Sequence, residues 1–123
     1  MKPFVNFSNH PSANWSHAQI SAATSYGDIV DIPFPTVPAE ISSDEISAIA
    51  DAYAARILGM DPSAVMCQGE FTLAFAVAAK LAAQNVTVLA ACSKRKVTET
   101  ATSDATQKLA VYEFVQFREY HLT

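Results

Sequence analysis

The chain has 123 residues, of which half are hydrophobic, and a formal net charge of −4 at pH 7. This length supports one domain with a single core over residues 1–123, and the apolar fraction excludes a disordered chain. The acidic balance argues against coating duplex nucleic acid, which requires a basic stripe, but it allows a small anionic ligand in a local basic pocket.

Strands and helices are predicted to alternate along most of the chain. The predicted elements are a strand over Phe4–Phe7, a helix from Ser16 to about Tyr26, a strand over Asp28–Pro33, a helix from Ser42 to Ile57, a strand over Ala64–Cys67, a helix from Glu70 to about Gln84, a strand over Val86–Ala91 and a final strand over Leu109–Tyr120. Ser16 and Ser42 are each followed three residues on by Gln or Glu, which is a capping box. Gly27 is expected to end the first helix in the left-handed region, and Gly59 to end the second. The polar segment Thr98–Lys108 is predicted to be a mobile connection.

This alternation predicts a single α/β layer sandwich with four parallel strands and three helices. The last strand has no room for a crossover helix before it, so it should pair antiparallel as an edge strand or hairpin. We favour the strand order 2-1-3-4-5, because it makes the loops after the first, third and fourth strands neighbours. The alternative order 3-2-1-4-5 would carry Gln68 and Gly69 to the far edge of the sheet.

Polar residues follow three of the predicted strands. Parallel strands deliver their carboxyl-terminal loops to one edge of the sheet, where open α/β sheets bind ligands. The residues expected to converge there are Ser8, Asn9, His10, Ser12, Gln68, Gly69, Glu70, Thr72, Ser93, Lys94 and Arg95. Hydroxyls, amides, cations and a helix N-terminus suit a phosphate-bearing ligand. The basic run Lys94–Lys96 could equally be a solvated surface.

Several of these residues allow two interpretations, one functional and one structural. His10 can shuttle protons near neutral pH, or it can be a partly buried histidine bonded to loop backbone. Glu70 could act as a base, but a glutamate in the first turn of a helix already has a structural role, because its negative charge interacts favourably with the helix dipole. Gly69 allows either close approach of a ligand or a plain tight turn, and Trp15 is either a stacking platform or a core residue. Since one of three consecutive strand-end cations must face away, Lys96 serves as the internal control for Lys94 and Arg95.

The helix over Phe71–Ala83 is apolar nearly all round, which predicts that a partner copy covers it or the aromatic face of Leu109–Tyr120 in a homo-oligomer. Its apolar stretch is far too short to span a bilayer, and no signal peptide is visible, so we expect a cytoplasmic protein with no membrane partner. The thiols of Cys67 and Cys92 are predicted to be buried and structural. No metal or cofactor is expected, because the loops offer too few carboxylates and no zinc spacing.

The opening Phe4–Pro11, the helix and strand after it, and the late Ser93-Lys94-Arg95 resemble the small stand-alone ring nucleases of CRISPR loci, which are related to the CARF sensor domains. The resemblance covers the general layout of most of the chain. It implies a Rossmann-like three-layer sandwich and a homodimer that binds a cyclic oligoadenylate, with cyclic tetra-adenylate favoured, across its two-fold axis. It further implies metal-independent cleavage that switches off type III CRISPR signalling.

In such proteins a ribose 2′-hydroxyl attacks its own phosphodiester and leaves a 2′,3′-cyclic phosphate. The resemblance would assign Lys94 and Arg95 to the transition-state charge, and Ser8, Asn9 and His10 to the ribose. The alternative reading is a non-catalytic module, which is either a nucleotide sponge or an oligomeric scaffold.

Overall fold

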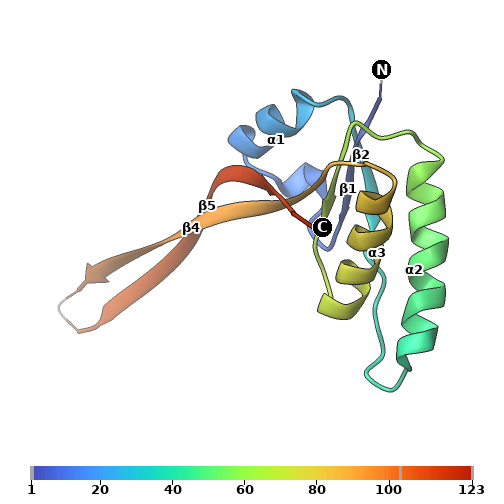
Figure 1. The fold of residues 1–123 in the computed structure, drawn as a ribbon. Coiled ribbons are helices and arrows are strands. Elements are labelled where there is room, and N and C mark those ends of the chain that lie inside the picture. Colours follow the sequence, from blue (N-terminus) through green and yellow to red (C-terminus); the bar gives the residue numbers. More distant parts are fainter. Residues whose placement is uncertain (1, 103, 123) are drawn as a thin grey trace.

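Residues 2–102 and 104–122 are described by a computed structural model of one mixed α/β domain (Figure 1). Its elements are β1 (Phe4–Ser8), a short 3-10 helix (Ser12–Asn14), α1 (His17–Thr24), β2 (Ile29–Pro33), α2 (Ser43–Leu58), β3 (Ala64–Cys67), α3 (Phe71–Ala83), β4 (Val88–Ala101) and β5 (Thr106–Glu119). The five strands form one sheet in the order β2-β1-β3-β4-β5. Neighbours are parallel from β2 to β4, and β4 and β5 pair antiparallel. The favoured strand order and the antiparallel final strand are confirmed.

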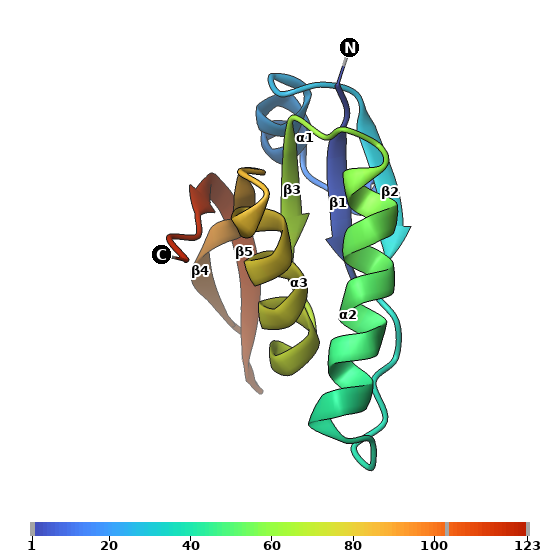
Figure 2. The same cartoon turned by 45° about the vertical axis from the view of Figure 1, so that its right-hand side comes forward.

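Side chains alternate between two cores on opposite faces of the sheet. Val5, Phe7 and Val65 belong to the core that α2 and α3 cover. Phe4 and Met66 belong to the core on the side of α1. Figures 1 and 2 show α2 and α3 together on one face, with α1 apart from them near the ribbon of β4 and β5. No helix among residues 2–102 and 104–122 is long and apolar enough to cross a membrane.

The helix ends follow the predicted capping chemistry with one exception. Ser42 and Glu45 form the complete capping box of α2, and the Ser16 hydroxyl accepts a hydrogen bond from the Gln19 backbone at 3.2 Å. The prediction for Gly27 is wrong, because its φ of 158° is not left-handed helical. A Cβ at Gly27 would lie 2.0 Å from the Lys2 carbonyl oxygen, so a close approach of two backbones requires this glycine.

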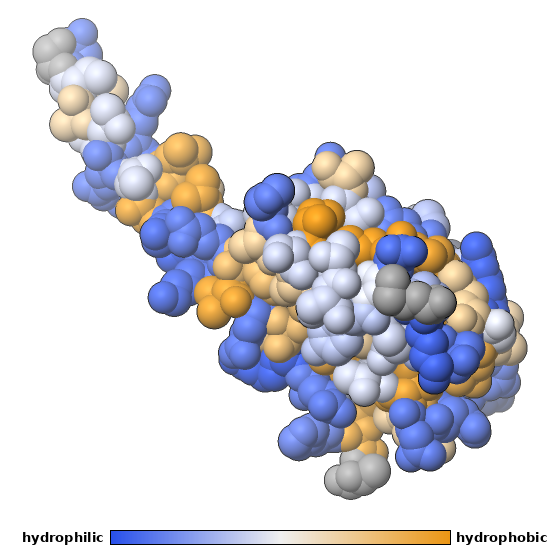
Figure 3. All heavy atoms as spheres, turned by 90° about the horizontal axis from the view of Figure 1, so that it is seen from above, coloured by the Kyte–Doolittle hydropathy of each residue, from blue (hydrophilic) through white to orange (hydrophobic). Residues whose placement is uncertain are grey.

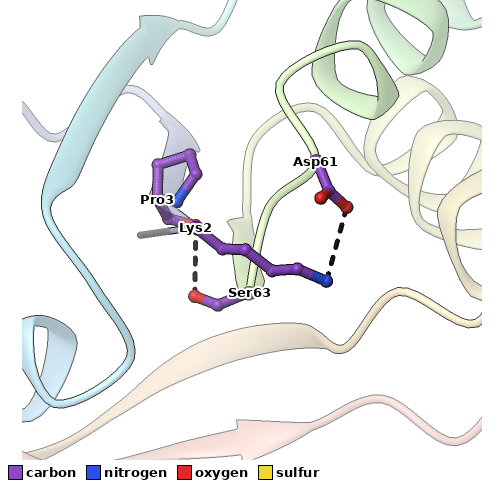
Figure 4. A network of polar contacts seen from close by, with 4 residues as sticks. All are labelled: Lys2, Pro3, Asp61 and Ser63. Carbon is purple, nitrogen blue, oxygen red and sulfur yellow. Dashed lines mark hydrogen bonds and ion pairs between the residues drawn. The ribbon is translucent and has the colours of Figure 1, made fainter.

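The start of β1 is fixed to the loop before β3 (Figure 4). Ser63 donates to the Pro3 carbonyl from its backbone N–H at 2.8 Å and from its hydroxyl at 3.1 Å. Lys2 lies 3.5 Å from the Asp61 carboxylate. The hydrogen bonds align β1 with β3 in register, with Phe4 beside Ala64.

The largest departure from the sequence prediction is at the C-terminal end. The fourth strand does not end at Ala91 but continues to Ala101, and β5 begins at Thr106 and not at Leu109. The segment expected to be a mobile connection, Thr98–Lys108, is therefore mostly paired strand. Together β4 and β5 form a two-stranded ribbon that extends well beyond the body of the domain (Figure 1).

Candidate functional site

A pocket of about 790 Å³ opens beside the carboxyl ends of β1 and β3, on the face of the sheet that α1 covers. Its polar lining is Asn9, His10, Asn14, Ser16, Gln19, Gln68 and Ser93, and its aromatic and other apolar lining is Pro11, Trp15, Met66, Ala91, Tyr112 and Phe114. Asn9 and His10 follow β1, Gln68 follows β3, and Ser93 lies within β4. The structure therefore brings together residues from all three predicted segments.

The loop that carries His10 is built on a buried polar network. Asn6 is 1% exposed and donates from Nδ2 to the His10 carbonyl at 2.9 Å and to the Asp31 carboxylate at 3.1 Å. Its Oδ1 accepts from the Ser8 hydroxyl at 2.6 Å, and that hydroxyl accepts from the His10 backbone N–H at 3.1 Å. Asp31 also accepts from the Ser12 N–H and hydroxyl. These bonds fix the backbone of the loop and leave the His10 side chain exposed.

Trp15 joins the loop to the aromatic core. Its indole Nε1 donates to the His10 carbonyl at 3.0 Å, and its ring lies edge-on to Phe4 with centroids 6.2 Å apart. The indole also lines the pocket. The interpretation of Trp15 as a core residue is confirmed by its packing on Phe4, and its role as a stacking platform stays a prediction.

Gln68 and Ser93 complete the polar wall. Gln68 accepts from the Ala91 backbone N–H at 2.6 Å through Oε1, which ties the residue after β3 to the first part of β4. Its Nε2 group has no hydrogen bond to any residue the structure describes. Gln68 and the exposed His10 therefore offer uncommitted polar groups to a ligand.

The three cations do not lie in a loop, because β4 continues through them. Side chains alternate along a strand, so Arg95 shares a face with Ser93, while Lys94 and Lys96 share the opposite face. Lys96 forms an ion pair with Glu113 at 3.0 Å on that opposite face. Arg95 is opposed by Tyr112, which lines the pocket. None of the three cations lines the pocket itself, and only Arg95 lies on the strand face of Ser93 and Tyr112, which do. The expectation that Lys96 alone faces away is therefore wrong, because Lys94 shares the opposite face with it.

Other predicted residues lie outside this pocket. The Ser8 hydroxyl is buried within the Asn6 network, and Ser12 is bonded to Asp31. Glu70 accepts from the backbone N–H groups of Thr72 and Leu73 and from the Thr72 hydroxyl, so it is the N-cap of α3 and its structural reading is confirmed. These hydrogen bonds lower the pKa of the Glu70 carboxyl.

Close packing against Phe34 explains why residue 69 is a glycine. A Cβ there would lie 2.6 Å from ring atoms of Phe34, a core residue. Glu70 and Thr72 border a different hollow next to residues 37–46, and Gly69 borders a third. The helix N-terminus of α3 is thus occupied by its own carboxylate and is not part of the His10 pocket.

The sequence did not reveal the aromatic wall made by Tyr112 and Phe114, or the network that Asn6 forms with Asp31. Asn6 interrupts an otherwise apolar run, and a polar residue inside a buried strand is the signal that could have identified the network. The aromatic wall depends on which face of the ribbon each residue occupies. That face could not be assigned without the pairing register.

The outer face of α3 carries a separate apolar surface. Phe71 is 89% exposed and Phe75 is 65% exposed, and both border a hollow of about 400 Å³ with Tyr120. Tyr120 donates to the Cys67 carbonyl at 3.2 Å, and burial raises its pKa. Burial also raises the pKa of the Cys67 thiol to about 12, and Cys67 is buried as expected, whereas Cys92 is only half-buried.

The model of the Uncharacterized protein MJ1673 family matches residues 2–118. Because the match covers nearly the whole chain, the protein belongs to this family. Searches of curated proteins and of solved structures gave no match.

Proposed function

For this member of the MJ1673 family, we propose that the chain binds and degrades a cyclic oligoadenylate, with cyclic tetra-adenylate favoured, as a cytoplasmic homodimer. Its role would be to switch off type III CRISPR signalling in antiviral defence. The observation that carries the proposal is the His10 pocket, in which aromatic rings, uncommitted amide groups and an exposed histidine meet beside the carboxyl ends of parallel strands.

The pocket has the chemistry that a nucleotide requires. Trp15, Tyr112 and Phe114 offer ring faces on which bases can stack, a contact worth about 1–3 kcal/mol per base in single-strand binding proteins. Gln68 and Asn9 offer amide groups to base edges or ribose hydroxyls. Arg95, on the Ser93 face of the ribbon, supplies positive charge for a phosphate.

The proposed reaction needs no metal. The ribose 2′-oxygen forms a bond to the adjacent phosphorus, the bond from phosphorus to the 5′-oxygen breaks, and the products carry a 2′,3′-cyclic phosphate and a 5′-hydroxyl. A proton leaves the 2′-hydroxyl and another reaches the 5′-oxygen. His10 is the pocket group suited to this transfer near neutral pH, and Arg95 would neutralise the charge that builds on the phosphoryl oxygens.

A second candidate is a nucleotide sponge that binds the ring without cleaving it. The observation in its favour is that His10 is the only imidazole, carboxyl or amine side chain among the described residues that line the pocket. Stacking and hydrogen bonding would retain the ring equally well without a second acid or base.

The two candidates are separated by incubating the protein with cyclic tetra-adenylate in EDTA and resolving the products by chromatography. Linear products that end in a 2′,3′-cyclic phosphate support the nuclease. An unchanged ring that stays bound to the protein supports the sponge. The absence of both cleavage and retention would refute both nucleotide functions.

Arg95→Ala and Lys94→Ala are a matched pair on opposite faces of β4. Arg95→Ala should slow cleavage by about 10²-fold or more, the scale lost with one oxyanion donor, whereas Lys94→Ala should cleave nearly as fast as the wild type. For His10→Ala, a flattened pH–rate profile indicates proton transfer, and an equal loss at every pH indicates positioning. Equal rates for all three variants and the wild type would refute the assigned roles.

We also propose that the domain is a variant of the Rossmann-like three-layer sandwich that the resemblance implies. The sheet order β2-β1-β3-β4 and the helices on both faces support this assignment.

A further inference from the structure

The ribbon has a long free edge that a folded protein normally covers. β4 pairs with β3 only at Val88 and Leu89, and no described strand adjoins its outer edge from Ser93 to Ala101, a length of roughly 30 Å. A two-stranded ribbon alone is only marginally stable in water, and unpaired edges invite pairing with another chain.

Apolar side chains are exposed along the same ribbon of β4 and β5, which forms an arm beside the body of the domain (Figure 3). Val97 is 46% exposed and Leu109 is 62% exposed, and Val111 and Tyr112 are exposed as well. Arg95 and Lys94 form no ion pair with any residue that the structure describes. The arm therefore has unmatched backbone groups, apolar surface and charge, all of which a partner strand would satisfy.

From this pattern we infer that two copies of the chain pair antiparallel along the free edge of β4, about a two-fold axis at Val97. Directly opposed side chains lie on the same face of an antiparallel pair. A two-fold axis perpendicular to the paired strands keeps the same face of β4 on the same side of the sheet in both copies. Each residue of one copy can therefore be opposed only by a residue that lies on the same face of β4 in the other copy. One residue must therefore meet its own copy at the axis.

Charge selects the register. With the axis at Val97, Arg95 of each copy opposes Glu99 of the other, and the two Val97 side chains meet. An axis at Lys96 would bring two lysines together, which is destabilising, and an axis at Thr98 would oppose Val97 with Glu99. Glu99 already lies 3.4 Å from Lys108 of its own chain, so Arg95 would add a second cation to that carboxylate.

The outer edge of β5 has no equivalent register. Over Thr106–Phe114 its only cation is Lys108 and its only anion is Glu113. These two residues lie on opposite faces of the strand, so no two-fold pairing opposes them. The charge pattern favours β4 as the contact between copies.

This pairing would join the two pockets on one surface. Ser93 and Arg95 face the pocket side in both copies, and the two Arg95 positions would be roughly 13 Å apart along the strands. An arginine has five N–H donors, so a carboxylate that accepts two of them leaves others for a phosphate. The inference rests on one part of the proposed function, the homodimer, and it does not depend on the identity of the ligand.

Charge reversal tests the register. Light scattering or sedimentation should show that the wild type is a dimer at micromolar concentration, and that Arg95→Glu and Glu99→Arg each weaken it by about tenfold or more. An equimolar mixture of the two variants should dimerise again, because both opposed pairs are then attractive. Lys94→Glu, which would oppose Thr100, makes the same charge change as Arg95→Glu on the other face and should have little effect.

Rescue by mixing depends on contact between positions 95 and 99 of different copies, so a variant that merely folds poorly cannot produce it. A monomeric wild type would overturn both the inference and the proposed homodimer. A dimer that neither single reversal weakens would overturn the β4 contact and direct attention to Phe71 and Phe75, while leaving the proposed dimer intact. Cyclic tetra-adenylate cleavage by the wild type is scored separately.

Discussion

Asn6→Ala should be among the most destabilising single substitutions in the chain. Asn6 is 1% exposed, and its amide makes three hydrogen bonds, to the His10 carbonyl, the Asp31 carboxylate and the Ser8 hydroxyl. A bond between neutral groups contributes about 1 kcal/mol net, and one to a charged group about 1.5–3 kcal/mol. Alanine should therefore cost about 3–5 kcal/mol, a large share of the roughly 5–15 kcal/mol that stabilises a typical domain.

The assay is equilibrium unfolding in urea, with the midpoint and the slope of the transition both measured. Asn9→Ala is the matched control, because Asn9 is exposed at the pocket and makes no hydrogen bond to any described residue. It should change the free energy of unfolding by less than about 0.5 kcal/mol. A loss below about 1 kcal/mol for Asn6→Ala would refute the network as the support of the loop.

A double-mutant cycle measures the coupling within the network. Asp31→Ala removes the acceptor of Asn6 and of the Ser12 N–H and hydroxyl, and the position is exposed. The two substitutions should couple by about 1–2 kcal/mol, because residues that share hydrogen bonds are not additive. Strict additivity would show that the two side chains act independently.

Three further predictions concern the helix start, the glycine corner and the thiols. Hydrogen bonds lower the pKa of Glu70, so its stabilisation is present above the ordinary glutamate pKa and is lost as pH falls through the lowered value; in urea, Glu70→Gln should destabilise at pH 7 and converge with the wild type in acid. Gly69→Ala should cost about 1–3 kcal/mol, since its Cβ would lie 2.6 Å from a core phenylalanine ring, whereas Gly59→Ala, with its nearest contact at 3.4 Å, should not destabilise in the same titration. Burial raises the pKa of Cys67 to about 12, so a thiol reagent at pH 8 should label Cys92 first and Cys67 only on unfolding, as peptide mass analysis would show.

Much of the fold could be predicted because local and long-range signals agree. The complete capping box at Ser42 and the apolar spacing up to Ile57 define α2 almost to the residue. Buried parallel strands such as Ala64–Cys67 appear in the sequence as short apolar runs between turn residues. The absence of room for a crossover helix correctly gave the antiparallel last strand.

The extension of the fourth strand from Cys92 to Ala101 could not be predicted, because both faces of the ribbon are largely exposed there. Periodicity identifies a strand when one face is buried, and Lys94–Thr100 has no such alternation. Lysine and glutamate are also depleted in strands, so propensity favoured a loop. The pairing comes from the partner strand, which begins at Thr106, and no local signal in either segment shows that register.

The pocket was predicted where parallel-sheet geometry governs it and missed where the register governs it. The loops after β1 and β3 meet as the shared direction of the strands requires. The aromatic wall depends on one extra residue, since Val115 has no partner between the Cys92–Gln116 and Ser93–Phe114 pairs. Strict alternation would place Phe114 and Phe117, three residues apart, on opposite faces.

The bulge puts both rings on one face, with centroids 4.9 Å apart. Phe117 packs on Phe4 in the core at 5.2 Å, and Phe114 lines the pocket. An unbroken aromatic row thus runs from the core beside α1 to the pocket wall. Bulges increase the local twist of a strand and re-aim its side chains. The extra residue Val115 therefore places Phe114 on the same face as Phe117, so that one aromatic row joins the core beside α1 to the start of the ribbon and to the pocket.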